Sequence, residues 1–154
     1  MLYKTHLIFS LFLGIIFVKY FPQQNIILFL TLVTLSGFLP DLDTPKSKLG
    51  RNLKIISWPI NFIFGHRGFF HSIFPPIIIY ILFYFTGYDY IGFAIFFGFI
   101  THLVGDALSK EGIAFFNPIS NFKVTGFFKT GGIIEKIIYY LLIISLIIFI
   151  YTNL

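Results

Sequence analysis

The chain has 154 residues, of which 57% are hydrophobic and 11% charged, against about 25% charged residues in soluble domains. Phenylalanine occurs 23 times, and a soluble domain of this length has too little interior to bury so much apolar surface. The absence of cysteine excludes disulfides and thiolate metal ligands. The net charge of +5 is spread over loops beside apolar stretches, which indicates contact with lipid headgroups and not with nucleic acid.

Five segments approach the roughly 20 apolar residues that a membrane-spanning helix needs. In chain order they are Thr5–Tyr20, Asn25–Leu39, Phe69–Phe85, Tyr90–Leu108 and Ile133–Tyr151. Leu53–Phe64 is also apolar, but it is short and Trp58-Pro59 interrupts it, so we expect it to lie at the interface or to fold back into the site. The sequence predicts an all-α, integral membrane helical bundle of about five transmembrane helices with two long cytoplasmic loops. The sequence contains no internal repeat and no linker, so we predict a single domain over residues 1–154.

The connections predict the orientation. Phe21–Gln24 and Thr86–Asp89 are short turns, whereas Pro40–Gly68 and Ser109–Gly132 are long and polar. Short and long connections alternate, so both long loops and the N-terminus share one side. That side carries Lys4, Lys46, Lys48, Arg51, Lys54, Arg67, Lys110, Lys123, Lys129 and Lys136, and the other carries Lys19. The positive-inside rule places the N-terminus and long loops in the cytoplasm of a multi-pass protein of the inner or plasma membrane. The first apolar stretch lacks a cleavage site, so we expect no cleaved signal peptide.

All four histidines and most carboxylates fall at the end of the bundle that carries the long loops. They are His6, Asp41, Asp43, His66, His71, His102, Asp106 and Glu111. Ionisable groups beside a bilayer are expensive and mark functional sites by default. Imidazoles and carboxylates gathered at the end of a helical bundle suit a divalent ion. The sequence therefore predicts one or two divalent metal ions, with zinc favoured and manganese, iron or magnesium as alternatives.

The spacing of the motifs bears on which side chains share a face. His102-x-x-x-Asp106 has the i, i+4 spacing that puts both side chains on one helical face. Asp41 and Asp43 point the same way if their segment is extended and diverge if it is helical, and Pro40 favours an irregular backbone there. Each motif alone also has a structural reading, as a histidine–aspartate hydrogen bond or a Pro-Asp turn. If every motif were only structural, its residues would lie at the same membrane face as the others by coincidence.

Four motifs follow one another along the chain. They are His6, then Leu39-Pro40-Asp41-Leu42-Asp43-Thr44-Pro45-x-Ser47-x-x-Gly50-Arg51, then His66-Arg67-Gly68-x-x-His71-Ser72, then Gly98-x-x-x-His102-Leu103-x-x-Asp106 with Gly112 after it. This order, from about His6 to Pro118, resembles the YdjM-type family, whose members are described as inner-membrane-associated, predicted metal-dependent hydrolases. Phe70 departs from the threonine usual in that family, which removes a hydroxyl but no ligand.

The motifs have a more distant similarity to zinc-dependent phospholipase C. That resemblance implies His6, Asp41, His66 or His71, and His102 with Asp106 as ligands. No histidine follows His102, so a trinuclear zinc site is not expected, whereas one or two ions fit the ligand supply. The resemblance favours phosphoester hydrolysis at a membrane surface.

We therefore expect a membrane-bound metal-dependent hydrolase that acts on a phosphoester or ester of a lipid or headgroup-level substrate. The expected metal ligands are His6, Asp41, Asp43, His66, His71, His102 and Asp106. Asp43 or Glu111 would serve as general base, and Arg67 and Arg51 would steady the anionic substrate. The expected partners are membrane lipids, without nucleic acid. The alternatives are a divalent-metal transporter or sensor, which the apolar helix interiors disfavour, and a non-catalytic membrane interaction protein.

Overall fold

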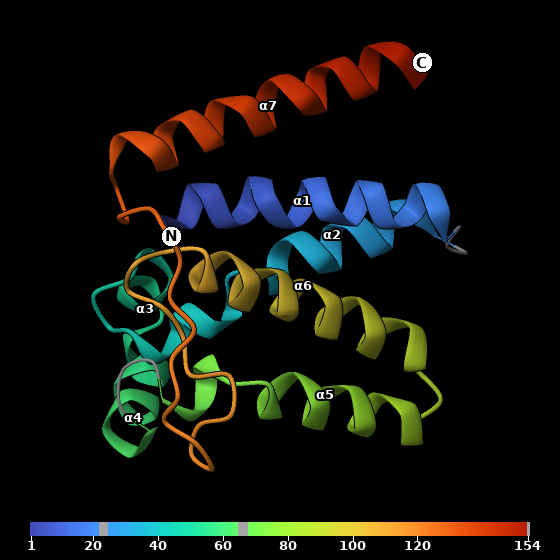
Figure 1. Cartoon of the computed structure of the whole chain (residues 1–154). Coiled ribbons are helices and arrows are strands. Elements are labelled where there is room, and N and C mark those ends of the chain that lie inside the picture. Colours follow the sequence, from blue (N-terminus) through green and yellow to red (C-terminus); the bar gives the residue numbers. More distant parts are fainter. Residues whose placement is uncertain (22–24, 65–67, 154) are drawn as a thin grey trace.

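The structure, a computed structural model, describes residues 1–21, 25–64 and 68–153, and within them the chain is helical (Figure 1). The helices are α1 (Tyr3–Tyr20), α2 (Ile26–Ser36), α3 (Lys48–Asn52), α4 (Lys54–Phe64), α5 (Phe74–Phe85), α6 (Asp89–Ala107) and α7 (Ile133–Asn153). Two 3₁₀ helices, η1 (Leu39–Asp43) and η2 (Phe69–His71), follow α2 and precede α5. The described residues contain isolated β-bridges but no strand, which confirms the predicted all-α class.

Four helical segments are long and apolar enough to cross a membrane. They are Tyr3–Tyr20, Ile26–Asp43, Asp89–Ala107 and Ile133–Thr152. The span predicted over Phe69–Phe85 is shorter than expected, because α5 has only 12 residues and reaches about 18 Å, against a hydrocarbon core of about 30 Å. Pro75 and Pro76 lie in its first turn, where a missing backbone N–H costs no helical hydrogen bond. The residues before them form η2 and an extended link at Ser72 instead.

The long connections and the N-terminus lie at one end of the bundle, as the alternation of loops predicts. Figure 1 shows the N-terminus, α3, α4 and the segment after α6 at that end, which we call the loop end, with the C-terminus at the other. At the loop end α4 runs as one helix through Pro59, so the interruption predicted at Trp58-Pro59 was wrong. A proline inside a helix removes one backbone hydrogen bond and kinks it without always ending it. Ile55, Trp58 and Phe62 of α4 are exposed, which suits a helix lying at a membrane surface.

Small residues let the spanning helices approach closely. A Cβ atom at Gly98 of α6 would collide with the Ser36 hydroxyl and with the carbonyl oxygen of Val33 on α2. Small residues at helix crossings are typical of membrane bundles, where close backbone packing replaces the hydrophobic driving force. The Ser10 and Thr101 hydroxyls lie 2.6 Å apart and join α1 to α6. These contacts fix the ends of three helices around the buried polar groups described below.

The segment between α6 and α7 folds back over the loop end. The N–H of Lys110 donates to the carbonyl of Phe128 at 2.7 Å, and Ile113 and Val124 exchange backbone hydrogen bonds of 3.0 and 2.9 Å. Ile113 and Phe128 are buried. The N–H of Ile73 donates to the carbonyl of Phe115 at 2.9 Å. The segment therefore holds the residues just after η2 in place beside α6.

Candidate metal centre

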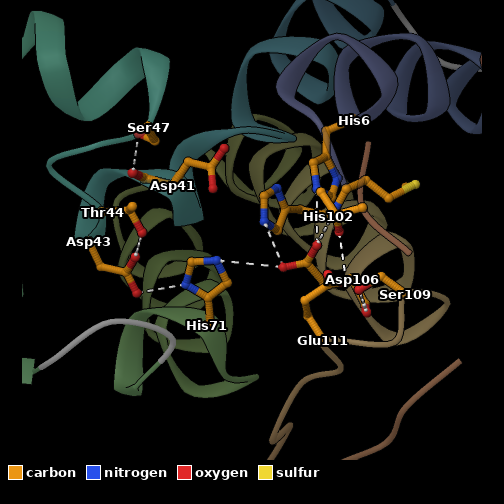
Figure 2. A network of polar contacts seen from close by, with 12 residues as sticks. His6, Asp41, Asp43, Thr44, Ser47, His71, His102, Asp106, Ser109 and Glu111 are labelled. Atoms are coloured by element: carbon orange, nitrogen blue, oxygen red, sulfur yellow. Dashed lines mark hydrogen bonds and ion pairs between the residues drawn. The ribbon is translucent and has the colours of Figure 1, made fainter. Parts of the chain in front are cut away.

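Six of the seven predicted ligands come together at the loop end, from four elements of the chain (Figure 2). His6 lies on α1, Asp41 and Asp43 on η1, His71 on η2, and His102 and Asp106 on α6. All except Asp41 are buried. The seventh, His66, lies outside the described residues. Segments about a hundred positions apart in sequence thus contribute to one polar cluster.

The Asp106 carboxylate lies between the three imidazoles. Its Oδ1 atom accepts from the Met1 ammonium at 2.5 Å and lies 3.2 Å from His6 Nε2. Its Oδ2 atom lies 3.7 Å from His102 Nε2 and 3.8 Å from His71 Nε2. The last two distances are longer than those of hydrogen bonds, so both of these nitrogens face the carboxylate at ion-pair distance.

The hydrogen bond made by His102 fixes which of its nitrogens can bind a metal. Its Nδ1 lies 2.8 Å from the carbonyl oxygen of Gly37, and a carbonyl only accepts, so Nδ1 carries the proton. In the neutral ring Nε2 then presents a lone pair. That atom is buried and has no hydrogen-bond partner in the structure. Buried polar atoms are nearly always paired, so Nε2 has the character of a metal ligand.

Asp43 orients His71. The Asp43 Oδ2 atom lies 2.7 Å from His71 Nδ1, and the Thr44 hydroxyl donates to Asp43 Oδ1 at 2.8 Å. A carboxylate that accepts from Nδ1 keeps the proton on that nitrogen, so Nε2 is the nitrogen that presents a lone pair, an arrangement common around metal-bound histidines. The segment is a 3₁₀ helix with three residues per turn, so Asp41 and Asp43 diverge. Of the two arrangements open from the sequence, the helical one holds.

His6 lies against His102 in a stacked arrangement. The ring centroids are 3.8 Å apart and the planes differ by 10°. His6 Nδ1 is also buried without a hydrogen-bond partner. A Cβ atom at Gly105 would lie 3.2 Å from the His6 ring and would collide with Met1, so glycine there admits both residues against α6. Neither Gly105 nor the Gly37 carbonyl could be recognised in the sequence, because both act through contacts between distant segments.

The donors form two overlapping groups. One consists of His6, His102 and Asp106, the other of Asp41, His71 and His102, and in each group the ligand atoms lie within 4.8 Å of one another. His102 belongs to both, yet only its Nε2 is available. Two ligand atoms on a tetrahedral ion with bonds of about 2.0–2.2 Å lie roughly 3.3–3.6 Å apart. The separations of 3.7 and 3.8 Å around Asp106 Oδ2 are close to this, so the cluster could hold one divalent ion.

The sequence matches the YdjM inner membrane protein family over residues 1–153. The chain belongs to this family. It is 37% identical over 91 residues to the inner membrane protein YdjM of Escherichia coli (strain K12), an alignment that covers 54% of this chain and 46% of that protein. It is 30% identical over 104 residues to the uncharacterized protein YvsG of Bacillus subtilis (strain 168), covering 66% and 65% of the two chains. The match thus spans about half the length of the curated YdjM relative. No solved structure matches the chain.

Of the remaining predicted site residues, Glu111 and Arg51 belong to neither donor group of this YdjM-family chain. Glu111 is exposed, and its carboxylate accepts from the Thr130 hydroxyl at 2.8 Å. Burial opposes the charge of Glu111, but hydrogen bonds from Thr130 and its neighbours outweigh it and hold the pKa of the carboxyl below its ordinary value. Arg51 is exposed on α3, and Arg67 lies outside the described residues.

The hydrogen bond between Asp43 and His71 predicts how a substitution of Asp43 changes the metal affinity of the YdjM-family site. Asp43→Asn removes the charge that holds the proton on His71 Nδ1. We expect metal affinity to fall by about 10- to 100-fold, the usual effect of losing a carboxylate behind a histidine ligand. Competition with a chromogenic chelator in detergent measures this. Asp89→Asn, an exposed carboxylate in the first turn of α6, should leave the affinity unchanged. Equal affinity in the Asp43 variant and the wild type would contradict the assigned role.

Proposed function

We propose that the protein is a membrane-bound metal-dependent hydrolase that cleaves a phosphoester or ester of a lipid or headgroup-level substrate. The observation that carries the proposal is the buried His102 Nε2 atom, which lacks a hydrogen-bond partner and faces further imidazole and carboxylate donors. A purely structural histidine would have this atom satisfied. A divalent cation would also offset the charges of the buried carboxylates, which are costly without a counter-charge.

The residues divide into those that hold the ion and those that position them. His6, His71, His102 and Asp106 would hold one divalent ion, with Asp41 on the less buried side. Three imidazoles and two carboxylates suit zinc, iron or manganese better than magnesium or calcium. A bound ion of this kind supplies Lewis acidity, which lowers the pKa of a water and polarises a phosphoryl or carbonyl oxygen. Asp43 would keep His71 in the tautomer whose Nε2 presents a lone pair to such an ion.

The proton of the attacking water needs an acceptor. Of the two carboxylates expected for this role, Asp43 is engaged by His71, which favours Glu111. Its pKa lies below the ordinary value, so Glu111 is ionised at neutral pH and able to accept a proton. Arg51 and Arg67 remain proposed contacts to the anionic substrate. We place the site on the cytoplasmic side, because ten of the 11 basic residues lie, in the sequence, in or beside the N-terminus and the two long connections.

The packing of the bundle favours hydrolysis over transport. Beyond the cluster the interior contains packed aromatic rings, with the Phe17 ring centred 5.6 Å from that of Phe29 and 4.7 Å from that of Phe97. Phe29, Val33 and Ala94 are fully buried there. An ion leaving the cluster toward the opposite membrane face would have to enter this apolar core, where a charge is strongly disfavoured. The cluster is therefore better placed to act at one membrane face than to pass ions across.

The test is turnover by the full chain reconstituted in liposomes. Phospholipids, phosphomonoesters and carboxyl esters are offered with zinc or manganese, and product release is measured before and after a chelator. We expect hydrolysis of at least one of these classes, loss with the chelator and recovery with added metal, with Asp89→Asn as an active control. Stoichiometric metal without turnover on any of the three classes would contradict the proposal and favour a metal-binding sensor.

A further inference from the structure

A pocket of about 310 Å³ adjoins the candidate metal centre at the loop end. It lies between α1, η1 and α3, and its lining residues are Tyr3, Leu7, Phe38, Asp41, Lys48, Leu49 and Asn52. Asp41 also belongs to the donor group with His71 and His102, and Figure 2 shows its carboxylate directed toward His102. A molecule in the pocket would therefore have one end next to the donors.

The lining combines apolar walls with one cation. Leu7, Phe38 and Leu49 supply the apolar surface. Lys48 Nζ donates to the Tyr3 hydroxyl at 2.9 Å and lies 4.3 Å from the centroid of its ring. Contact with an aromatic face leaves the ammonium charged. Among the described residues no carboxylate forms an ion pair with Lys48, so its charge is available to a ligand.

We infer that this pocket binds the phosphate and the first part of an acyl chain of a phospholipid-type substrate. The inference rests on the proposed function and names the substrate class for the same site. Lys48 would hold the phosphate as a point charge, with the Tyr3 hydroxyl and the Asn52 amide as further hydrogen-bond donors. The pocket volume is at the low end for ligand sites, so it suits the headgroup region while the rest of the chains stays in the bilayer.

Charge complementarity links the pocket to the donor groups. A phosphate held by Lys48 would approach the Asp41 carboxylate, which repels it. A divalent ion bound beside Asp41 reverses this, because it attracts both the carboxylate and the phosphate. A neutral lipid gains nothing from Lys48, and inorganic phosphate gains nothing from the apolar walls. Both parts of the lining therefore select one ligand, an anionic amphiphile.

The experiment measures binding, which does not depend on turnover. Zinc-loaded full-length protein in detergent is titrated calorimetrically with dioctanoyl phosphatidic acid, dioctanoylglycerol and inorganic phosphate. We expect the phosphatidic acid to bind most tightly. Lys48→Gln should weaken its binding at least about 10-fold, and Lys48→Arg should largely restore it. Leu7→Trp, which fills the pocket, should weaken binding without changing the zinc content. Lys54→Gln, an exposed lysine of α4 outside the pocket lining, is the matched control.

The outcomes separate this inference from the proposed function. Equal binding of dioctanoylglycerol would overturn the phosphate site, and equal binding of inorganic phosphate would overturn the acyl site. Unchanged binding in both Lys48→Gln and Leu7→Trp would overturn the pocket itself, even if the protein hydrolyses lipids elsewhere. Selective binding of phosphatidic acid without any turnover would support the pocket while contradicting the hydrolase.

Discussion

Asp106→Asn is expected to lower zinc affinity by more than about 100-fold, because loss of a carboxylate that merely supports a ligand already costs 10- to 100-fold. Asparagine keeps the shape of the side chain but removes the charge that lies 3.2 to 3.8 Å from all three imidazoles. Elemental analysis of detergent-purified protein, equilibrated with chelator-buffered zinc, measures the change. The variant should remain helical by circular dichroism.

Glu135→Gln is the matched control for this variant. Glu135 is another buried carboxylate at the loop end, and it accepts from the N–H groups of Leu2 and Gly131, both at 2.6 Å. Neither of these hydrogen bonds involves a histidine. We expect its replacement to cost about 1–3 kcal/mol of the free energy of unfolding and to leave zinc affinity unchanged. If both variants lost zinc equally, the loss would reflect damaged packing and the ligand assignment of Asp106 would be wrong.

Gly98→Ala is expected to lower the free energy of unfolding by about 3 kcal/mol, near the upper end for overpacking. The added methyl group would meet the backbone of Val33, which cannot move aside as a side chain can. Pushing α2 away from α6 also lengthens the hydrogen bond between His102 and the Gly37 carbonyl. Zinc affinity should therefore fall together with the thermal unfolding temperature. Circular dichroism and zinc titration of the same preparation measure both.

Gly14→Ala on α1 is the control for close helix packing. A Cβ atom there would lie 3.1 Å from Leu30 Cδ2 and 3.3 Å from Val33 Cγ1, which are tips of side chains that can shift. We expect a much smaller loss of stability and unchanged zinc affinity. Equal effects of the two substitutions would mean that the close contact of α2 with α6 does not position His102.

The convergence of the cluster could be predicted from the sequence, because it follows from two one-dimensional facts. Apolar segments of spanning length fix which chain positions lie at a membrane face, and alternating short and long connections put His6, Asp41, His71 and Asp106 at the same one. The i, i+4 spacing of His102 and Asp106 placed them on one helical face. These inferences need no knowledge of side-chain contacts.

The roles of the individual residues in the cluster could not be predicted in this way. Whether Asp41 and Asp43 share a direction depends on the local backbone, which Pro40 leaves open between extended and 3₁₀ conformations. The free nitrogen of His102 depends on the Gly37 carbonyl, which reaches it only through the packing of α2 on α6. The pocket beside Lys48 likewise depends on α3 lying against α1. The shortness of α5 had a visible signal in Pro75 and Pro76, which favour a helix start.

Two helices, α2 and α6, end at the cluster, with Gly37 and Leu108 as their C-terminal caps. The carbonyl end of a helix carries roughly half a negative elementary charge, so both termini add negative potential to that of three aspartates. An anionic lipid arriving first would be repelled by this field, whereas a cation would be drawn in. Binding should therefore be ordered, with the ion entering before the lipid and the lipid leaving before the ion.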